Sequence, residues 1–280
     1  MGICALCGVS RTLRQSHYLA AAFFRRLHGR DRGKTLHPIS LNAKRTMYDC
    51  KQLQTKLLCD ICEHRFKTQG EDWVIDCTCQ KDGGFPLRDL LLQNRPIGQV
   101  GQPPKASVYY GDKIPELRHS ELIYFAASVF WRGWTYDWSQ VSADVPHVVL
   151  PSRLGPEFQD FLLGRASLPA SVILQVEVAL NPVFSSGNIG MIFPSRIVPR
   201  IHNVGLSDVG YSFLVFGMTF LLYFDLGKHA GLRTKALSIA VPPHPIFLTD
   251  VRMSEADEGR NRLDATAKRV GRLAHSSTGK

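Results

Sequence analysis

Two pairs of cysteines near the N-terminus have the spacing of a metal site. Cys4 and Cys7 form one CxxC pair, and Cys59 and Cys62 form the second. Thiolates three residues apart can chelate Zn²⁺ from one tight turn, and two such pairs complete a tetrahedral set of ligands. Gly8 follows the first pair and permits the turn. The pattern favours a structural zinc site over a redox pair or free buried thiols, because a thioredoxin-type pair needs a βαβ context that this segment lacks.

The other three cysteines are Cys50, Cys77 and Cys79, so all seven lie in the first 80 residues. An odd number cannot all pair internally, and Cys77 and Cys79 are too close for a zinc knuckle. We interpret Cys50 and Cys77 as small buried apolar residues, with a second metal site as the alternative. The chain opens without the apolar run of a signal peptide, which predicts a cytoplasmic protein with reduced thiols.

Positive charge is concentrated in the same part of the chain. The formal net charge is +10 and the pI is about 9.4. Residues 1–70 contain 13 Lys and Arg against 4 Asp and Glu, a net +9, so the other 210 residues contribute only +1. Such a basic segment favours an acidic partner, and nucleic acid is the best candidate. The cations expected to contact phosphate are Arg25, Arg26, Arg30, Arg32, Lys34, Lys44 and Arg45.

The order of these motifs resembles the HNH (ββα-metal) endonucleases that carry a zinc site. The resemblance covers about residues 1–75 and rests on three pieces: Cys4-Ala-Leu-Cys7, then Ser16-His17, then Leu57-Leu58-Cys59-Asp60-Ile61-Cys62-Glu63. It implies a treble-clef fold of two strands and a helix, held by a structural Zn²⁺. It also implies a separate catalytic ion, Mg²⁺ or Mn²⁺, that polarises the scissile phosphate of DNA.

The resemblance also assigns roles to individual residues. His17 would be the general base that activates water, and Glu63 would ligate the catalytic metal, since hard cations prefer oxygen ligands. Asn42 would orient the base. Ser16 departs from the family, which has Asp or His there, and a serine hydroxyl is a poor metal ligand. His64 could assist Glu63.

Three classes of function therefore stay open. The first is a metal-dependent endonuclease acting on DNA. The second is a zinc-bound treble clef that binds nucleic acid or a protein and has lost the chemistry, with His17 packed in the fold and Glu63 a surface carboxylate. The third is a redox or metal-sensing protein, which would need exposed zinc thiolates.

The rest of the chain carries no catalytic motif. The sequence predicts an α+β fold: a zinc module over 1–80, a turn-rich linker over 81–117, a domain of helices and antiparallel sheet over 118–253, and a polar tail over 254–280. Helices are predicted over 17–27, 60–75, 120–138 and 156–163, and strands within 171–193, 205–225 and 237–241. Phe130-Trp131-Arg132-Gly133-Trp134 could stack bases, but its helical spacing is more typical of a core. The apolar stretch 211–224 is too short to cross a membrane.

Overall fold

The computed structural model describes residues 1–27, 30–31, 34–35, 39–41, 46–48, 52–78, 80, 84–100, 106–141, 147–181, 195–197, 210–224 and 238–249. The tail from residue 254 lies outside these ranges. Among the described residues, no helix combines the length and the apolar character needed to cross a bilayer.

The N-terminal module consists of short strand pairs and two helices. β1 (Gly2–Ile3) pairs with β2 (Ser10–Arg11), and β3 (Leu13–His17) pairs antiparallel with β8 (Gln54–Cys59). α1 (Ala21–Leu27) follows β3, so the helix predicted from residue 17 begins at Ala21 and His17 belongs to a strand. Two further pairs lie between α1 and β8: β4 (Arg30–Asp31) with β5 (Lys34–Thr35), and β6 (Ile39–Leu41) with β7 (Thr46–Tyr48).

A long helical segment starts directly after β8. It comprises α2 (Asp60–Phe66), the π-helical turn η1 (Lys67–Glu71) and α3 (Asp72–Cys77), which confirms the predicted helix over 60–75. In the π turn the Asp72 N–H donates to the carbonyl of Lys67, five residues back. Gly70 lies in this turn, where an added Cβ would stand 2.8 Å from the backbone nitrogen of Phe125. The glycine therefore lets the segment pack closely against the next long helix.

The second half is built on a seven-stranded sheet in the order β12-β13-β14-β11-β15-β10-β9. Its neighbours are antiparallel except β11 and β15, so the sheet is mixed and the prediction of a purely antiparallel sheet was wrong. The physical reason is that β11 and β15 are joined by a crossover, whereas a tight hairpin imposes antiparallel pairing. The strands are β9 (Gly98–Val100), β10 (Ala106–Tyr110), β11 (Val172–Ala179), β12 (Ser195–Ile197), β13 (Gly210–Val215), β14 (Met218–Phe224) and β15 (Pro245–Thr249).

The predicted segments match these elements unevenly. Of the strands expected within 171–193 and 205–225, β11, β13 and β14 are present, and residues 182–193 and 205–209 lie outside the described residues. The strand expected over 237–241 is displaced to β15. The segment expected to be a turn-rich linker contains α4 (Pro86–Gln93), β9 and β10. The remaining helical elements are η2 (Gly111–Lys113), α5 (His119–Thr135), η3 (Trp138–Gln140) and α6 (Leu154–Leu162).

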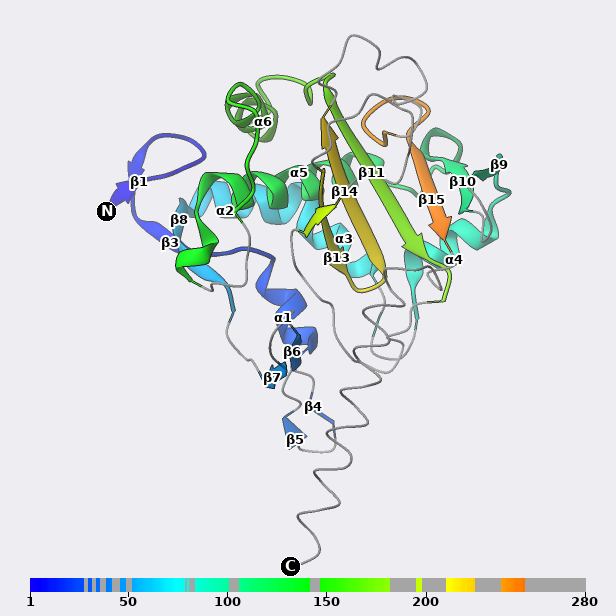
Figure 1. Cartoon of the computed structure of the whole chain (residues 1–280), viewed down its shortest axis with the longest axis horizontal. Helices are drawn as coiled ribbons and strands as arrows, with labels where there is room; N and C mark the ends of the chain where they lie inside the picture. Colours follow the sequence, from blue (N-terminus) through cyan, green and yellow to red (C-terminus); the bar gives the residue numbers. More distant parts are fainter. Residues whose placement is uncertain are drawn as a thin grey trace, which may run out of the picture.

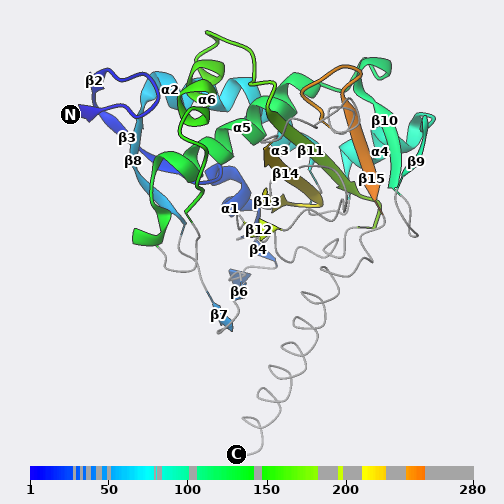
Figure 2. The ribbon, with the colours of Figure 1, turned by 45° about the horizontal axis from the view of Figure 1, so that its top comes forward.

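α5 is the central helix of the core. It lies between α2 on one side and strands β11 and β14 on the other (Figures 1 and 2). Residues 122–133 of α5 are all buried, as expected for a helix covered on every side. Phe125 packs edge-on against Phe213 and Phe220 of the sheet, and Trp131 packs edge-on against Phe66 of α2. One continuous core cluster therefore joins the N-terminal module to the sheet.

Candidate zinc centre and the surface around it

The structure brings the four predicted cysteines together. The Sγ atoms of Cys4, Cys7, Cys59 and Cys62 all lie within 4.8 Å of one another, and those of Cys7 and Cys59 are 3.9 Å apart. Four thiolates at about 2.3 Å from a tetrahedral Zn²⁺ are about 3.8 Å apart, so this arrangement fits the ion. Cys7 is half-buried and the other three are buried.

The local backbone explains why the two pairs converge. The segment after Cys4 turns back on itself, with the Gly8 N–H donating to the Cys4 carbonyl and Gly8 at a φ of 71°. The Ala5 N–H then donates to the carbonyl of Leu57, which ties the first pair to β8. The backbone N–H of Cys59 donates to Sγ of Cys4 at 3.3 Å. An N–H aimed at a sulfur stabilises a thiolate, which is the form that binds zinc.

The electrostatics of the cluster also call for a cation. Burial raises the pKa of Cys62, and the neighbouring Cys4 thiol raises it further. Four clustered thiols, three of them buried, cannot all ionise beside one another unless a positive ion compensates their charge. Zn²⁺ would supply that charge and would crosslink β1, β8 and α2, so its role here is structural.

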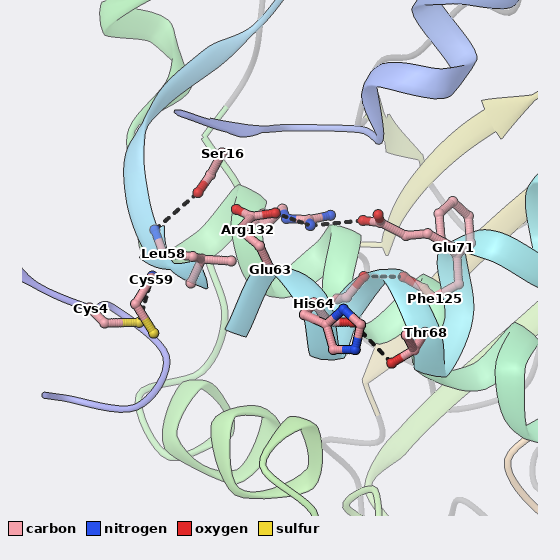
Figure 3. Close-up of polar contacts among 11 residues, drawn as sticks. Cys4, Ser16, Leu58, Cys59, Glu63, His64, Thr68, Glu71, Phe125 and Arg132 are labelled. Carbon is pink, nitrogen blue, oxygen red and sulfur yellow. Dashed lines mark hydrogen bonds and ion pairs between the residues drawn. The ribbon is translucent and has the colours of Figure 1, made fainter. Parts of the chain in front are cut away.

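The Ser16 side chain forms a hydrogen bond at a β-bulge in the β3–β8 strand pair, next to the cysteine cluster. The register shifts between Leu13, opposite Cys59, and Gln15, opposite Lys56, so that two residues of β8 lie opposite one residue of β3. Such a β-bulge leaves a backbone group without its ladder partner. The buried Ser16 hydroxyl accepts the N–H of Leu58 at 3.0 Å (Figure 3). The Ser16 hydroxyl therefore stabilises the bulge, whereas the resemblance would place a metal ligand at this position.

His17 lies on the opposite side of the strand pair from Ser16. It pairs across the ladder with Gln54, as Gln15 pairs with Lys56. Directly opposed residues share a face of a sheet, as do residues two apart on one strand. Gln15, Gln54 and Lys56 are exposed, and His17 is half-buried. His17 therefore lies on an open polar face.

Glu63 instead engages a residue from the second half of the chain. Its carboxylate is 4.0 Å from Nη2 of Arg132 on α5, and the same nitrogen is 2.8 Å from Glu71. Arg132 has 1% of its side chain exposed, Glu71 9% and Glu63 26%. Figure 3 shows the guanidinium between the two carboxylates. It also lies over the ring of Phe66, 4.6 Å from the centroid.

The π turn explains why both carboxylates reach one arginine. In an uninterrupted α-helix, residues eight apart are rotated by about 80° from each other. The π turn absorbs one residue, so Glu63 and Glu71 are placed as if seven apart, with a rotation of about 20°. Thr68, within the turn, donates its hydroxyl hydrogen to the carbonyl of His64. The side chain of His64 itself is exposed.

The remaining predicted site residues fall into two groups. Arg25 is exposed, and its contact with phosphate stays a prediction. Asn42, Lys44, Arg45 and Arg32 lie outside the described residues, and so do the side chains of Arg26, Arg30 and Lys34. Among the described cysteines outside the cluster, Cys77 is half-buried, and burial raises the pKa of its thiol to about 12.

Comparisons with known protein families, with curated proteins and with solved structures give no match.

Sequence reasoning missed the part played by Arg132 and Glu71. The run Phe130 to Trp134 predicted a core helix, and Phe130, Trp131 and Arg132 are indeed buried. A charged residue inside an apolar helical run needs a buried partner. That signal could have prompted a search for the partner, but the chain offers 24 Asp and Glu and only the fold selects among them.

Proposed function

We propose that this chain is a nucleic-acid-binding protein whose basic N-terminal module is stabilised by Zn²⁺ bound to Cys4, Cys7, Cys59 and Cys62. The observation that carries the proposal is that the module has more cations than acids and that both of its acids are already paired. Residues 1–27 and 52–66 contain six Lys and Arg and two acids, Asp60 and Glu63. Both acids are paired with arginines.

The exposed cations provide the binding surface. Arg11, Arg25 and Lys56 are exposed on the module. Arg14 is also exposed but pairs with Asp60 at 3.0 Å, so it balances the one exposed acid of these segments. Positive charge that is not balanced by nearby carboxylates attracts the phosphate backbone and releases its counterions. Nucleic acid is therefore the partner that we propose.

The same contacts argue against a catalytic metal held as the HNH resemblance implies. The Glu63 carboxylate faces a buried guanidinium, which competes with a divalent cation for the same oxygens. The Ser16 hydroxyl is committed to a backbone N–H. The Ser16 position is thus engaged by the fold. At Glu63 the nearby guanidinium disfavours a second cation, although the Oε1 atom of the carboxylate has no hydrogen-bond partner among the described residues. The order of two strands and a helix around a four-cysteine cluster supports the treble-clef part of the resemblance.

An endonuclease is the second candidate, and one observation favours it. The imidazole of His17 lies on an open face of β3, where the resemblance places a general base. A base in this position could activate water if a metal were supplied by other ligands.

The test is a binding titration of the full, zinc-loaded chain with fluorescent DNA at several salt concentrations. We expect the logarithm of the affinity to fall linearly with the logarithm of salt concentration. Lys56→Gln and Arg25→Gln should each weaken binding and lower the slope by about 1. Lys113→Gln, a change of an exposed cation on η2 far from the zinc module, is the matched control and should leave both unchanged.

Plasmid DNA incubated with Mg²⁺ or Mn²⁺ separates the two candidates. We expect binding without cutting. Metal-dependent cutting that is lost in His17→Ala would replace our proposal by the nuclease. An absence of salt-dependent binding to any nucleic acid would refute it.

A further inference from the structure

The exposed face of the β3–β8 pair carries a regular set of polar side chains. The pairs Gln15–Lys56 and His17–Gln54 lie next to each other on this face, because the ladder register places them directly across and two residues apart. Three of the four side chains are exposed. Among the described residues, β3 and β8 form a sheet of their own with two strands.

The other side of the ribbon packs against the core. Ser16, Leu57 and Leu58 are buried beneath it, and both leucines lie at the bulge. The bulge thus places two apolar residues in succession toward the core while the flanking positions keep their polar side chains outward. The result is a rigid ribbon, attached to the zinc site at Cys59, with one hydrogen-bonding face.

From this arrangement we infer that the β3–β8 ribbon enters the major groove of duplex DNA and reads base edges. This inference rests on the proposed nucleic-acid binding and names the form of the ligand. The major groove of B-DNA is about 12 Å wide and admits a two-stranded ribbon. The two cross-strand pairs are about 6.7 Å apart along the strands, which matches about two base-pair steps of 3.4 Å.

The side-chain types on the ribbon suit this groove. Glutamine forms paired hydrogen bonds with N6 and N7 of adenine, and lysine donates to O6 and N7 of guanine. Gln15 and Gln54 supply the first chemistry and Lys56 the second, with the His17 imidazole as a further polar contact. Arg11 and Arg25, exposed on the same module, would hold the flanking phosphates.

Duplex RNA does not suit such a ribbon as a ligand. The major groove of A-form RNA is deep and narrow, so side chains on a ribbon cannot reach its base edges. Single strands are bound mainly by aromatic stacking platforms, and this face carries no Phe, Tyr or Trp at its four positions. The observations therefore favour duplex DNA.

The experiment begins with selection of a preferred duplex from a random pool, using the full zinc-loaded chain. Gln15→Ala and Gln54→Ala are then titrated against the selected duplex and a scrambled one. We expect each to weaken binding to the selected duplex by about 5- to 150-fold and to weaken binding to the scrambled duplex much less. Gln99→Ala removes an exposed glutamine from strand β9 of the other sheet and is the matched control.

A change in the DNA tests the groove itself. Replacement of the purines by 7-deazapurines removes the N7 acceptor from the major groove and leaves the minor groove intact. We expect this replacement to weaken binding of the wild type and to add little to the effect of Gln15→Ala or Gln54→Ala. Zinc content and melting temperature of each variant should equal those of the wild type, because the substituted side chains are exposed.

The outcomes distinguish the two proposals. Salt-dependent DNA binding that is indifferent to both glutamines and to 7-deazapurines would overturn the ribbon and leave the proposed function standing. Equal affinity for duplex RNA of the same sequence, or a preference for single strands, would also overturn the ribbon. Failure to bind any nucleic acid would overturn both.

Discussion

Replacement of Arg132 by methionine should destabilise the fold strongly. The change removes the guanidinium that lies 2.8 Å from Glu71, whose side chain is 9% exposed. An uncompensated buried charge costs about 3–5 kcal/mol. Loss of the cation–π contact with Phe66 adds about 1–2 kcal/mol, and a sulfur–aromatic contact from the methionine returns about 1 kcal/mol. We expect a net loss of about 3–6 kcal/mol in the free energy of unfolding.

Urea denaturation of the zinc-saturated protein at pH 7.5 measures this loss. Since total stabilities of about 5–15 kcal/mol are typical, Arg132→Met could leave too little folded protein, and Arg132→Lys then serves as the milder change. The double variant Arg132→Met with Glu71→Gln removes the charge that was left behind. Its loss in the free energy of unfolding should be smaller than the sum of the losses of the two single variants by about 1–3 kcal/mol.

Two results would refute this reasoning. One is an Arg132→Met protein within about 1 kcal/mol of the wild type, which would mean that the carboxylates do not depend on the arginine. The other is strict additivity in the double variant, which would mean that Arg132 and Glu71 are not energetically coupled.

Four further outcomes follow from other parts of the structure. Ser16→Ala should cost about 1–3 kcal/mol in urea denaturation, because it leaves a buried backbone N–H without its acceptor; a neutral effect would show that water replaces the hydroxyl. Gly70→Ala should destabilise by about 1–3 kcal/mol despite its better helix propensity, because the added Cβ meets the α5 backbone at 2.8 Å; a more stable variant would contradict the close packing. The rings of His119 and His244 stack at 3.8 Å, and burial together with His244 holds the pKa of His119 below its ordinary 6.5. The unfolded chain therefore takes up the proton first, so stability should fall as the pH drops below about 6.5. His119→Gln should show a smaller fall in melting temperature between pH 8 and 5.5, and an equal fall would count against the stack. Atomic absorption should find one zinc per chain, and its removal by EDTA should lower the melting temperature, whereas an unchanged melting temperature would contradict a structural role.

The cluster of four cysteines was predictable from the sequence because its chemistry is local. Two residues between the members of each cysteine pair fix a chelating turn whatever the rest of the fold does, and Gly8 marks the turn. The helix after Cys59 and the core helix from His119 were predictable for a similar reason, since their apolar spacing is a property of neighbouring residues.

The face on which each candidate residue lies was decided only by tertiary structure. Ser16 and His17 are adjacent in sequence, yet the pleat of β3 sends one to the core and the other to an open face. No local pattern announces the bulge in β8 that gives the serine its partner, because a bulge depends on the register of two strands 37 residues apart, from His17 to Gln54.

The environment of Glu63 depends on a contact with a residue that is even further away in the sequence. Its position after the second cysteine pair is the same in a metal ligand and in an ion-paired carboxylate. The difference is made by Arg132, which α5 brings to it from 69 residues away, and by the π turn that aligns Glu71 on the same side. The sequence by itself therefore indicated a basic N-terminal module with four cysteines spaced to bind zinc, since ligand type, spacing and charge are local properties of the sequence. Only the packing of α5 against α2 decided which of its charged groups face inward, because burial is a property of contacts between segments that the sequence keeps apart.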